Sequence, residues 1–304
     1  MRDGPVDFHV HSCWSGDADF RPEELVRRAR LTEFEAISIA DHDSIRAYPA
    51  ALEAGREQGV EIIPNLEMTT RYDGREFHLL LPFVDWRSPA LAGMLEQARL
   101  VRLSEGKERV DRLRRLGFPL TWEEVQSAAL RKGEDVLPVG VFIARYLLDK
   151  PEVRAEASAA KYYTRGMGEP DAFLFYTDYF EKGRPAYAPK RYINLVEVLE
   201  LAPETGAKPV LAHPGAHFMQ ADRRDLERLK ERGLKGLEVY TSYHQPPLRP
   251  DRSLERFYLD LADSLGLVPT AGSDFHGQIK PFIPFGLVRE GRYWMVERLR
   301  NGGG

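Results

Sequence analysis

The feature that most constrains the fold is a series of short apolar segments, several of them followed by histidine or a carboxylate. The first, residues 6–10, alternates apolar and polar residues with the two-residue period of a β-strand, which places His9 and His11 on one face. Further strands are expected at 36–40, 60–63, 76–81, 209–212, 237–240 and 267–270. Helical patterns at 22–31, 45–58, 193–205, 225–232 and 254–265 lie between most of them, so the sequence predicts an α/β fold with parallel strands.

Two regions depart from this alternation. Only residues 68–75, with an Asp73-Gly74 turn, separate the strands expected at 60–63 and 76–81, which predicts a local hairpin. From Pro89 to Tyr187 the patterns are helical, with helices expected at 91–116, from Thr121 onward, at 139–148 and at 172–180. We therefore predict an α/β domain in two parts, residues 1–86 and 191–304, interrupted by a helical subdomain at 87–190 that covers the strand ends. Residues 279–300 are expected to form an extended piece and a short terminal helix.

The composition is typical of a globular protein with neither a membrane span nor a basic surface. Hydrophobic residues make up 43% of the chain and charged residues 30%, and the net charge of −4 gives no reason to expect stable binding of duplex nucleic acid. The single cysteine, Cys13, excludes an intrachain disulfide and is interpreted as a small loop residue. Because the first residues do not resemble a signal peptide, a cytoplasmic location is expected.

Histidines gather at the ends of the expected strands, where α/β barrels carry their catalytic groups. Six of the eight histidines lie there with two carboxylates, a set that contains His9, His11, His42, Glu67, His78, His213, Asp274 and His276. Imidazole and carboxylate without thiolate suit Mn, Zn or Fe, and the ligands are too many for one ion. Two or three closely spaced ions can activate a water molecule and stabilise the attacking and leaving oxygens, a chemistry best suited to phosphate esters.

These motifs, in this order, resemble those of the PHP (polymerase and histidinol phosphatase) family. The resemblance rests on Asp7-Phe8-His9-Val10-His11-Ser12, Ala40-Asp41-His42-Asp43, Glu67 with His78, Ala212-His213-Pro214, and Gly272-Ser273-Asp274-Phe275-His276-Gly277. It implies a distorted seven-stranded (β/α) barrel with an inserted helical subdomain and up to three metal ions, between which a bridging hydroxide would act as the nucleophile.

The resemblance also implies a role for each site residue. It assigns His9, His11, Glu67 and Asp274 to a first ion, Asp17, His42 and His276 to a second, and His78 and His213, with Glu67 bridging, to a third. Asp7 and Asp41 would orient the histidines through their far ring nitrogens.

The helical insertion and the stretch Gly183-Arg184-Pro185-Ala186-Tyr187-Ala188-Pro189 resemble the branch of the family that hydrolyses nucleotide phosphates. Members of that branch act on nucleoside 3′,5′-bisphosphates, AMP-like monoesters or short 5′-phosphorylated RNA, so the expected partner is a small phosphorylated substrate. Arg184 and Lys190 are candidates to bind its phosphate, and His244 is a candidate to assist the leaving group. Solvated charges and an ordinary loop histidine are the alternative interpretations.

Two departures from the family pattern bear on the site. The loop Ser15-Gly16-Asp17-Ala18-Asp19 is one residue longer than usual, which makes Asp19 a rival of Asp17 as a ligand. Nucleotide-cleaving relatives often carry Gly-Arg-Pro-His at the start of an insertion helix, whereas residues 139–145 here lack that Arg and His. A phosphatase for a small ester such as histidinol phosphate, and a non-catalytic metal-stabilised interaction domain, are therefore kept as alternatives. The aromatic residues between Tyr162 and Phe180 are expected either to stack a base or to form the insertion's own core.

Overall fold

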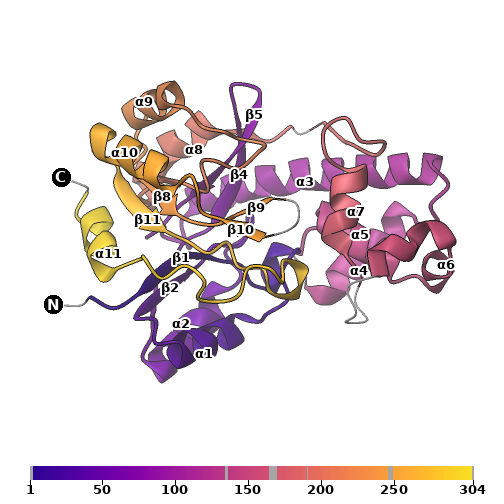
Figure 1. The fold of residues 1–304 in the computed structure, drawn as a ribbon, viewed down its shortest axis with the longest axis horizontal. Coiled ribbons are helices and arrows are strands. Elements are labelled where there is room, and N and C mark those ends of the chain that lie inside the picture. Colours follow the sequence, from indigo (N-terminus) through magenta and orange to yellow (C-terminus); the bar gives the residue numbers. More distant parts are fainter. Residues whose placement is uncertain (1–2, 134–135, 164–169, 190, 246–248, 303–304) are drawn as a thin grey trace.

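Strands and helices alternate along most of the chain, as the sequence predicts (Figure 1). The computed structural model describes residues 3–133, 136–163, 170–189, 191–245 and 249–302. A three-stranded parallel sheet contains β1 (Val6–Val10), β2 (Ala36–Ile39) and β3 (Glu61–Ile62). A six-stranded mixed sheet has the order β11 (Val268–Ala271), β8 (Gly236–Tyr240), β7 (Val210–Leu211), β5 (Arg75–Leu80), β4 (Glu67–Tyr72) and β6 (Ile193–Asn194). The predicted α/β class is confirmed.

Isolated bridges, rather than continuous ladders, join the two sheets. Such bridges are found between Val10 and Phe275, beyond the end of β11, and between His42, beyond the end of β2, and Glu67 at the start of β4. The backbone adopts a positive φ beside each joint, 50° at Asp43 and 54° at Asp274, and this conformation interrupts regular strand pairing. The strands are therefore not closed into one barrel, and the predicted seven-stranded barrel is not confirmed.

The predicted hairpin is present, but its first strand lies later in the chain than expected. β4 and β5 pair antiparallel around Asp73-Gly74, which adopt φ values of 47° and 74°, as a two-residue hairpin turn requires. The segment expected as the first strand of this hairpin is the short β3, which belongs to the other sheet. The prediction missed β4 because its sequence, Glu67-Met68-Thr69-Thr70-Arg71-Tyr72, lacks the apolar alternation of a half-buried strand, although its first four residues are buried.

The predicted helix at 193–205 is the clearest error in secondary structure. The segment begins as β6, continues as α8 (Leu195–Leu201) and ends as a 3-10 turn, η3 (Ala202–Thr205). The side chain of Asn194 accepts a hydrogen bond from Val196 N and so caps a helix that begins two residues later than expected. A small antiparallel ladder of β9 (Tyr243–Gln245) and β10 (Arg249–Asp251) was not predicted either.

Helices cover the outer faces of the sheets. α1 (Pro22–Leu31) and α2 (Tyr48–Gln58) pack together beside β2 and β3, whereas α9 (Arg223–Glu231), α10 (Glu255–Leu265) and α11 (Tyr293–Arg300) lie beside β8 and β11 (Figure 1). The cores are built from aliphatic and aromatic side chains such as Ile37, Phe77 and Leu237, all fully buried. No helix in the described part of the chain is both long and apolar enough to cross a membrane.

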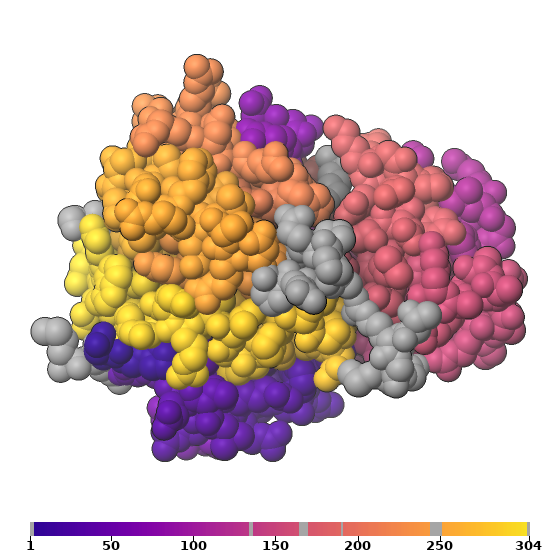
Figure 2. All heavy atoms as spheres, viewed as in Figure 1, coloured from indigo at the N-terminus to yellow at the C-terminus, as the bar shows by residue number. Residues whose placement is uncertain are grey.

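The helices between β5 and β6 form a hydrophobic core of their own. α3 (Pro89–Arg115) runs from the six-stranded sheet into this group, which continues with α4 (Trp122–Lys132), α5 (Gly140–Leu148), α6 (Pro151–Arg154), η2 (Ala157–Tyr163) and α7 (Ala172–Tyr179) (Figure 1). Figure 2 shows the group as a lobe beside the orange and yellow C-terminal part. Tyr162, Phe175 and Phe180 are buried in its core, which confirms the structural interpretation of these aromatic residues. The division of the chain at residues 87 and 190 stays a prediction.

Candidate metal centre

All nine predicted metal ligands gather where the two sheets meet. His9 lies on β1, and His11 follows β1. Glu67 opens β4, His78 lies on β5, and the remaining side chains come from loops that follow β1, β2, β7 and β11. Three groups have ligand atoms within 4.8 Å of one another: His9, His11, Glu67 and Asp274; His11, Asp17, His42 and His276; and His42, Glu67 and His78. The ninth residue, His213, places its Nε2 2.9 Å from Glu67 Oε1.

Glu67 lies at the centre of this arrangement and is fully buried. Its Oε1 is 2.8 Å from His78 Nδ1, and its Oε2 is 2.9 Å from His42 Nδ1. No described residue, however, lies in hydrogen-bond geometry to Glu67 Oε2 or His42 Nδ1. Buried polar atoms are rarely left in this state, and a carboxylate oxygen facing an imidazole lone pair is the arrangement expected around a shared cation.

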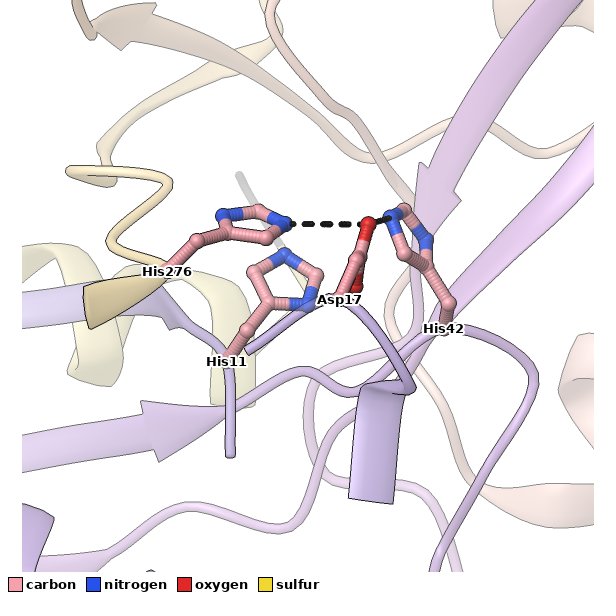
Figure 3. A group of neighbouring side chains, drawn as sticks. All are labelled: His11, Asp17, His42 and His276. Atoms are coloured by element: carbon pink, nitrogen blue, oxygen red, sulfur yellow. Dashed lines mark ion pairs between the residues drawn. The ribbon is translucent and has the colours of Figure 1, made fainter. Parts of the chain in front are cut away.

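The second group, shown in Figure 3, leaves space between its ligand atoms. Asp17 Oδ2 lies 3.6 Å from both His42 Nε2 and His276 Nε2, which is too far for a hydrogen bond. The rings of His11 and His276 stack with their centroids 3.9 Å apart. His276 Nε2 and Asp17 Oδ1 are both buried, and neither has a hydrogen-bond partner within the described part of the chain.

The structure separates the two candidate aspartates of the first loop. Asp17 joins the second group, whereas Asp19 Oδ1 accepts a hydrogen bond at 2.7 Å from Arg145 Nη1 on α5. Asp19 Oδ2 accepts a further bond from the backbone of Gln278. The geometry therefore favours Asp17 as the ligand and makes Asp19 the link between this loop and the insertion.

The electrostatics of the cluster suit divalent cations. Burial, together with the neighbouring His276, lowers the pKa of His11 to about 3, so this imidazole is neutral at physiological pH. Burial raises the pKa of Glu67, but His42 and His78 outweigh it and hold that pKa well below its usual range. Ionised carboxylates and neutral imidazoles are the protonation states that metal binding requires.

Two other histidines, His9 and His78, have raised pKa values and can carry a proton that balances the charge of the carboxylates. Burial lowers the pKa of His9, yet the carboxylates of Glu238 and Glu67 raise it well above its ordinary value. Burial likewise opposes protonation of His78, but Glu67 and Glu76 raise its pKa to about 9. We infer that bound cations would displace protons from these rings.

The sequence analysis missed the residue that orients His9. Glu238, on β8, is fully buried and places its Oε1 3.0 Å from His9 Nδ1, which leaves His9 Nε2 facing the other ligands. Its Oε2 accepts a hydrogen bond from His213 N at 2.7 Å. The signal that could have identified it is a lone carboxylate between Leu237 and Val239 in an otherwise apolar strand.

The predicted roles of Asp7 and Asp41 are wrong in detail. Among the described residues, neither carboxylate is hydrogen-bonded to a histidine ring: Asp7 Oδ1 accepts from the backbone of His9 and Ser273, and Asp41 accepts from the backbone and hydroxyl of Ser12. Both are buried, and burial raises their pKa values to about 6 and about 7. They hold the backbone of the ligand-bearing loops, because an unpaired buried N–H is costly.

The insertion contacts the centre through a largely buried ion pair. Arg102 on α3 donates from Nε to Asp43 Oδ2 at 2.9 Å, and Asp43 follows His42 directly. Asp43 Oδ1 accepts a bond from Thr69 N, which ties the same loop to β4. The insertion therefore helps to fix the position of the His42 loop.

A pocket adjoins the centre, and Arg184 is the predicted substrate-binding residue whose described side chain can be compared with it. This pocket has a volume of about 70 Å³ and is lined by ligands such as His78 and His213. Arg184 is exposed and is not among its described lining residues. His244 lies on β9, and Lys190 falls outside the described residues. His217, an exposed residue of the lining, lies 3.6 Å from Glu181 through its Nε2.

Comparison with known proteins finds relatives that span almost the whole chain and a family model that matches its N-terminal part. Residues 7–116 match the PHP domain. The 5′-3′ exoribonuclease Rnm of Salmonella typhimurium is 27% identical over 284 residues, covering 92% of this chain and 87% of the relative. The phosphoribosyl 1,2-cyclic phosphate 1,2-diphosphodiesterase of Eggerthella lenta is 28% identical over 278 residues, covering 90% of this chain and 94% of the relative.

A solved structure extends this likeness to three dimensions. A protein of Bifidobacterium adolescentis, provisionally described as a metal-dependent phosphoesterase, superposes with a TM-score of 0.82 at 26% identity. The match covers 98% of this chain and 96% of that protein. The likeness therefore includes the helical insertion as well as the two sheets.

Proposed function

We propose that the chain, whose residues 7–116 match the PHP domain, is a metal-dependent phosphoesterase that hydrolyses phosphate esters of nucleotides or of short 5′-phosphorylated RNA. The observation that carries the proposal is the sharing of His11, His42 and Glu67 between groups of candidate ligands. Shared ligands hold ions close together, and closely spaced ions suit the displacement of an oxygen at phosphorus.

The donor set fits two or three divalent ions, and Mn, Zn or Fe are the candidates. The fit rests on three buried atoms without a hydrogen-bond partner among the described residues: His42 Nδ1 and Glu67 Oε2 face each other, and His276 Nε2 faces Asp17 Oδ2. When bound, such ions supply an activated water and stabilise the negative charge that develops on the phosphate oxygens.

The chain's own residues position the ligands. Glu238 holds His9 Nδ1, and Ser15 Oγ lies 2.7 Å from His11 Nδ1, so the Nε2 atoms of both rings face Glu67 and Asp274. This fixed orientation lowers the cost of reorganisation when substrate binds.

The substrate class rests on the relatives and on the insertion. An exoribonuclease is similar to this chain over almost its full length, which supports a nucleotide or RNA substrate. Arg184, Lys190 and His244 keep their proposed roles as contacts to phosphate and leaving group. A small non-nucleotide ester is the second candidate, because Arg145, the arginine on α5, pairs with Asp19 rather than standing free for substrate.

The test measures phosphate release by the Mn-loaded protein from a nucleoside 3′,5′-bisphosphate, AMP, a 5′-phosphorylated RNA oligomer and histidinol phosphate. We expect kcat/KM to be highest for one of the nucleotide substrates, and we expect Asp274→Ala to abolish release while the protein stays folded. Preference for histidinol phosphate would favour the second candidate. No release from any substrate by protein with measured metal would contradict the proposal and favour a metal-stabilised interaction domain.

A further inference from the structure

Ser242 and Lys280 line the pocket beside the metal centre and have no assigned role. Predicted ligands, among them His42, line part of the pocket, and Phe218, Ser242, Tyr243 and Lys280 line another part. The sequence analysis singled out neither Ser242 nor Lys280.

Lys280 is the only lysine or arginine among the described residues that line the pocket. It follows the 3-10 turn η4 (Gly277–Ile279), and its side chain is 11% exposed. Its Nζ lies 2.9 Å from Asp274 Oδ2, while Asp274 Oδ1 lies 3.2 Å from His11 Nε2. Asp274 therefore directs one oxygen to the predicted ligands and the other to Lys280. An ammonium group has three donors, so Lys280 can bind a second anion without releasing Asp274.

Ser242 supplies an independent sign of a missing partner. It follows β8, is 3% exposed, and its Oγ is buried without a hydrogen-bond partner among the residues that the structure describes. A buried hydroxyl loses its bonds to water on folding and normally regains one from the protein or from a ligand. Because Ser242 lines the same pocket as Lys280, one ligand could satisfy both groups.

We propose that Lys280 and Ser242 form an anion subsite that binds non-bridging oxygens of the phosphate group undergoing hydrolysis. This inference rests on the proposed function and names two residues that the substrate contacts. The ligand is a phosphate ester. Its negative charge matches the ammonium of Lys280, and its oxygens can accept from the Ser242 hydroxyl. The position beside Asp274, His42, His78 and His213 assigns the subsite to the reacting phosphate rather than to a distant one.

The subsite could replace the Arg and His of the Gly-Arg-Pro-His motif, which residues 139–145 do not carry. Arg145 is bound to Asp19, and Arg184 is not among the described pocket lining, so neither takes that place in this structure. Lys280 brings the positive charge from the C-terminal part of the chain instead. The phosphate site then belongs to the same set of loops as the metal ligands.

The experiment measures binding of inorganic phosphate to Mn-loaded protein by calorimetry, for the wild type, Lys280→Met, Ser242→Ala and a control, Lys182→Met. Lys182 is exposed and does not line the pocket. We expect Lys280→Met to raise the Kd for phosphate by roughly ten- to a hundredfold, because it removes a charged hydrogen bond, and Ser242→Ala to raise it roughly threefold to tenfold. The control should bind phosphate as the wild type does.

Metal content separates this proposal from a role of Lys280 as a counter-ion of Asp274. Elemental analysis should give the same metal per chain in wild type and Lys280→Met, and Lys280→Arg should bind phosphate more tightly than Lys280→Met. Unchanged phosphate binding in Lys280→Met would overturn the proposal, and so would weaker binding that follows metal loss in proportion.

Substrate comparison tests the assignment to the reacting phosphate. Lys280→Met should reduce kcat/KM by similar factors for a nucleoside monophosphate and for a nucleoside 3′,5′-bisphosphate. An effect on the bisphosphate alone would overturn the assignment. Because calorimetry needs no turnover, phosphate binding tests the subsite even if no substrate of the panel is hydrolysed.

Discussion

The cluster of predicted metal ligands and the helical insertion both contain buried charged groups, but these groups are paired in different ways. In the cluster, buried atoms of His42, Glu67 and His276 face other ligand atoms without a hydrogen bond to any described residue. In the insertion, Arg109 Nη2 lies 2.6 Å from Glu105 Oε1, both side chains are 3% exposed, and the guanidinium lies over the rings of Tyr176 and Phe180. The cluster is arranged for an additional cation, whereas the insertion balances its own charge apart from the unpartnered Arg109 Nε.

Removing one ligand should break the function of the cluster without unfolding the chain. We expect His9→Ala to lower kcat/KM for phosphate release by more than a hundredfold, beyond the ten- to hundredfold cost typical of residues that only orient ligands. Circular dichroism should show a folded protein, because the variant removes a polar side chain of the ligand cluster and leaves the packed apolar cores intact. Full activity in a variant of verified metal content would show that His9 is not a ligand.

Removing one charge from the insertion should have the opposite result. Arg109→Met leaves the buried Glu105 without its ion-pair partner on α3, with the hydrogen bond from the Tyr192 hydroxyl still in place. We expect the free energy of unfolding to fall by about 3–5 kcal/mol in denaturant titrations. Metal content of the folded protein should stay unchanged. The matched double variant Arg109→Met/Glu105→Leu should recover much of the loss, since it leaves no lone charge. If Arg109→Met were as stable as the wild type, the insertion would not depend on the pairing of its buried charges.

Glu238→Gln tests the support beneath the cluster. The amide keeps the size of the side chain but removes the charge that faces His9 Nδ1. We expect Mn affinity to fall by roughly ten- to a hundredfold, measured by titration with a competing chelator. Equal affinity in Glu238→Gln and the wild type would mean that the carboxylate serves the backbone of His213 alone.

The smallest effect is expected at the exposed joint between the two regions. Arg145 and Asp19 form an ion pair with side chains 29% and 22% exposed. Arg145→Met should therefore change the free energy of unfolding by less than about 1 kcal/mol. Thermal unfolding with and without Mn would check this. A larger loss that appears only with Mn present would show that the joint positions Asp17.

The clustering of the candidate metal ligands could be predicted from the sequence because their signal is local. Each follows or lies within a short strand, and parallel strands bring such ends together whatever the closure of the sheet. Asp17 and Asp19 could not be separated in this way, because their difference depends on Arg145, which lies more than a hundred residues later.

The parts that escaped prediction depend on contacts between distant segments. In the sequence, Glu238 is a single polar residue within an apolar strand. Its role becomes visible only in the fold, where it contacts His9 on β1. Lys280 and Ser242 carry no motif, and only the folded loops bring them to one pocket. The break between the sheets follows from positive φ values at Asp43 and Asp274, which strand periodicity does not reveal.

The central carboxylate has a consequence for how the chain holds together. Glu67 contacts His9 on the first strand and His213 on a loop that lies 146 positions after Glu67 in the sequence. An ion held by such ligands would act as a cross-link between residues that are far apart in the sequence. Closing such a long loop costs conformational entropy, and that cost rises only slowly with the length of the loop. Removal of the metal would weaken the contact between the N-terminal and C-terminal parts. After chelation, we therefore expect amide hydrogen exchange to increase first where the two sheets meet.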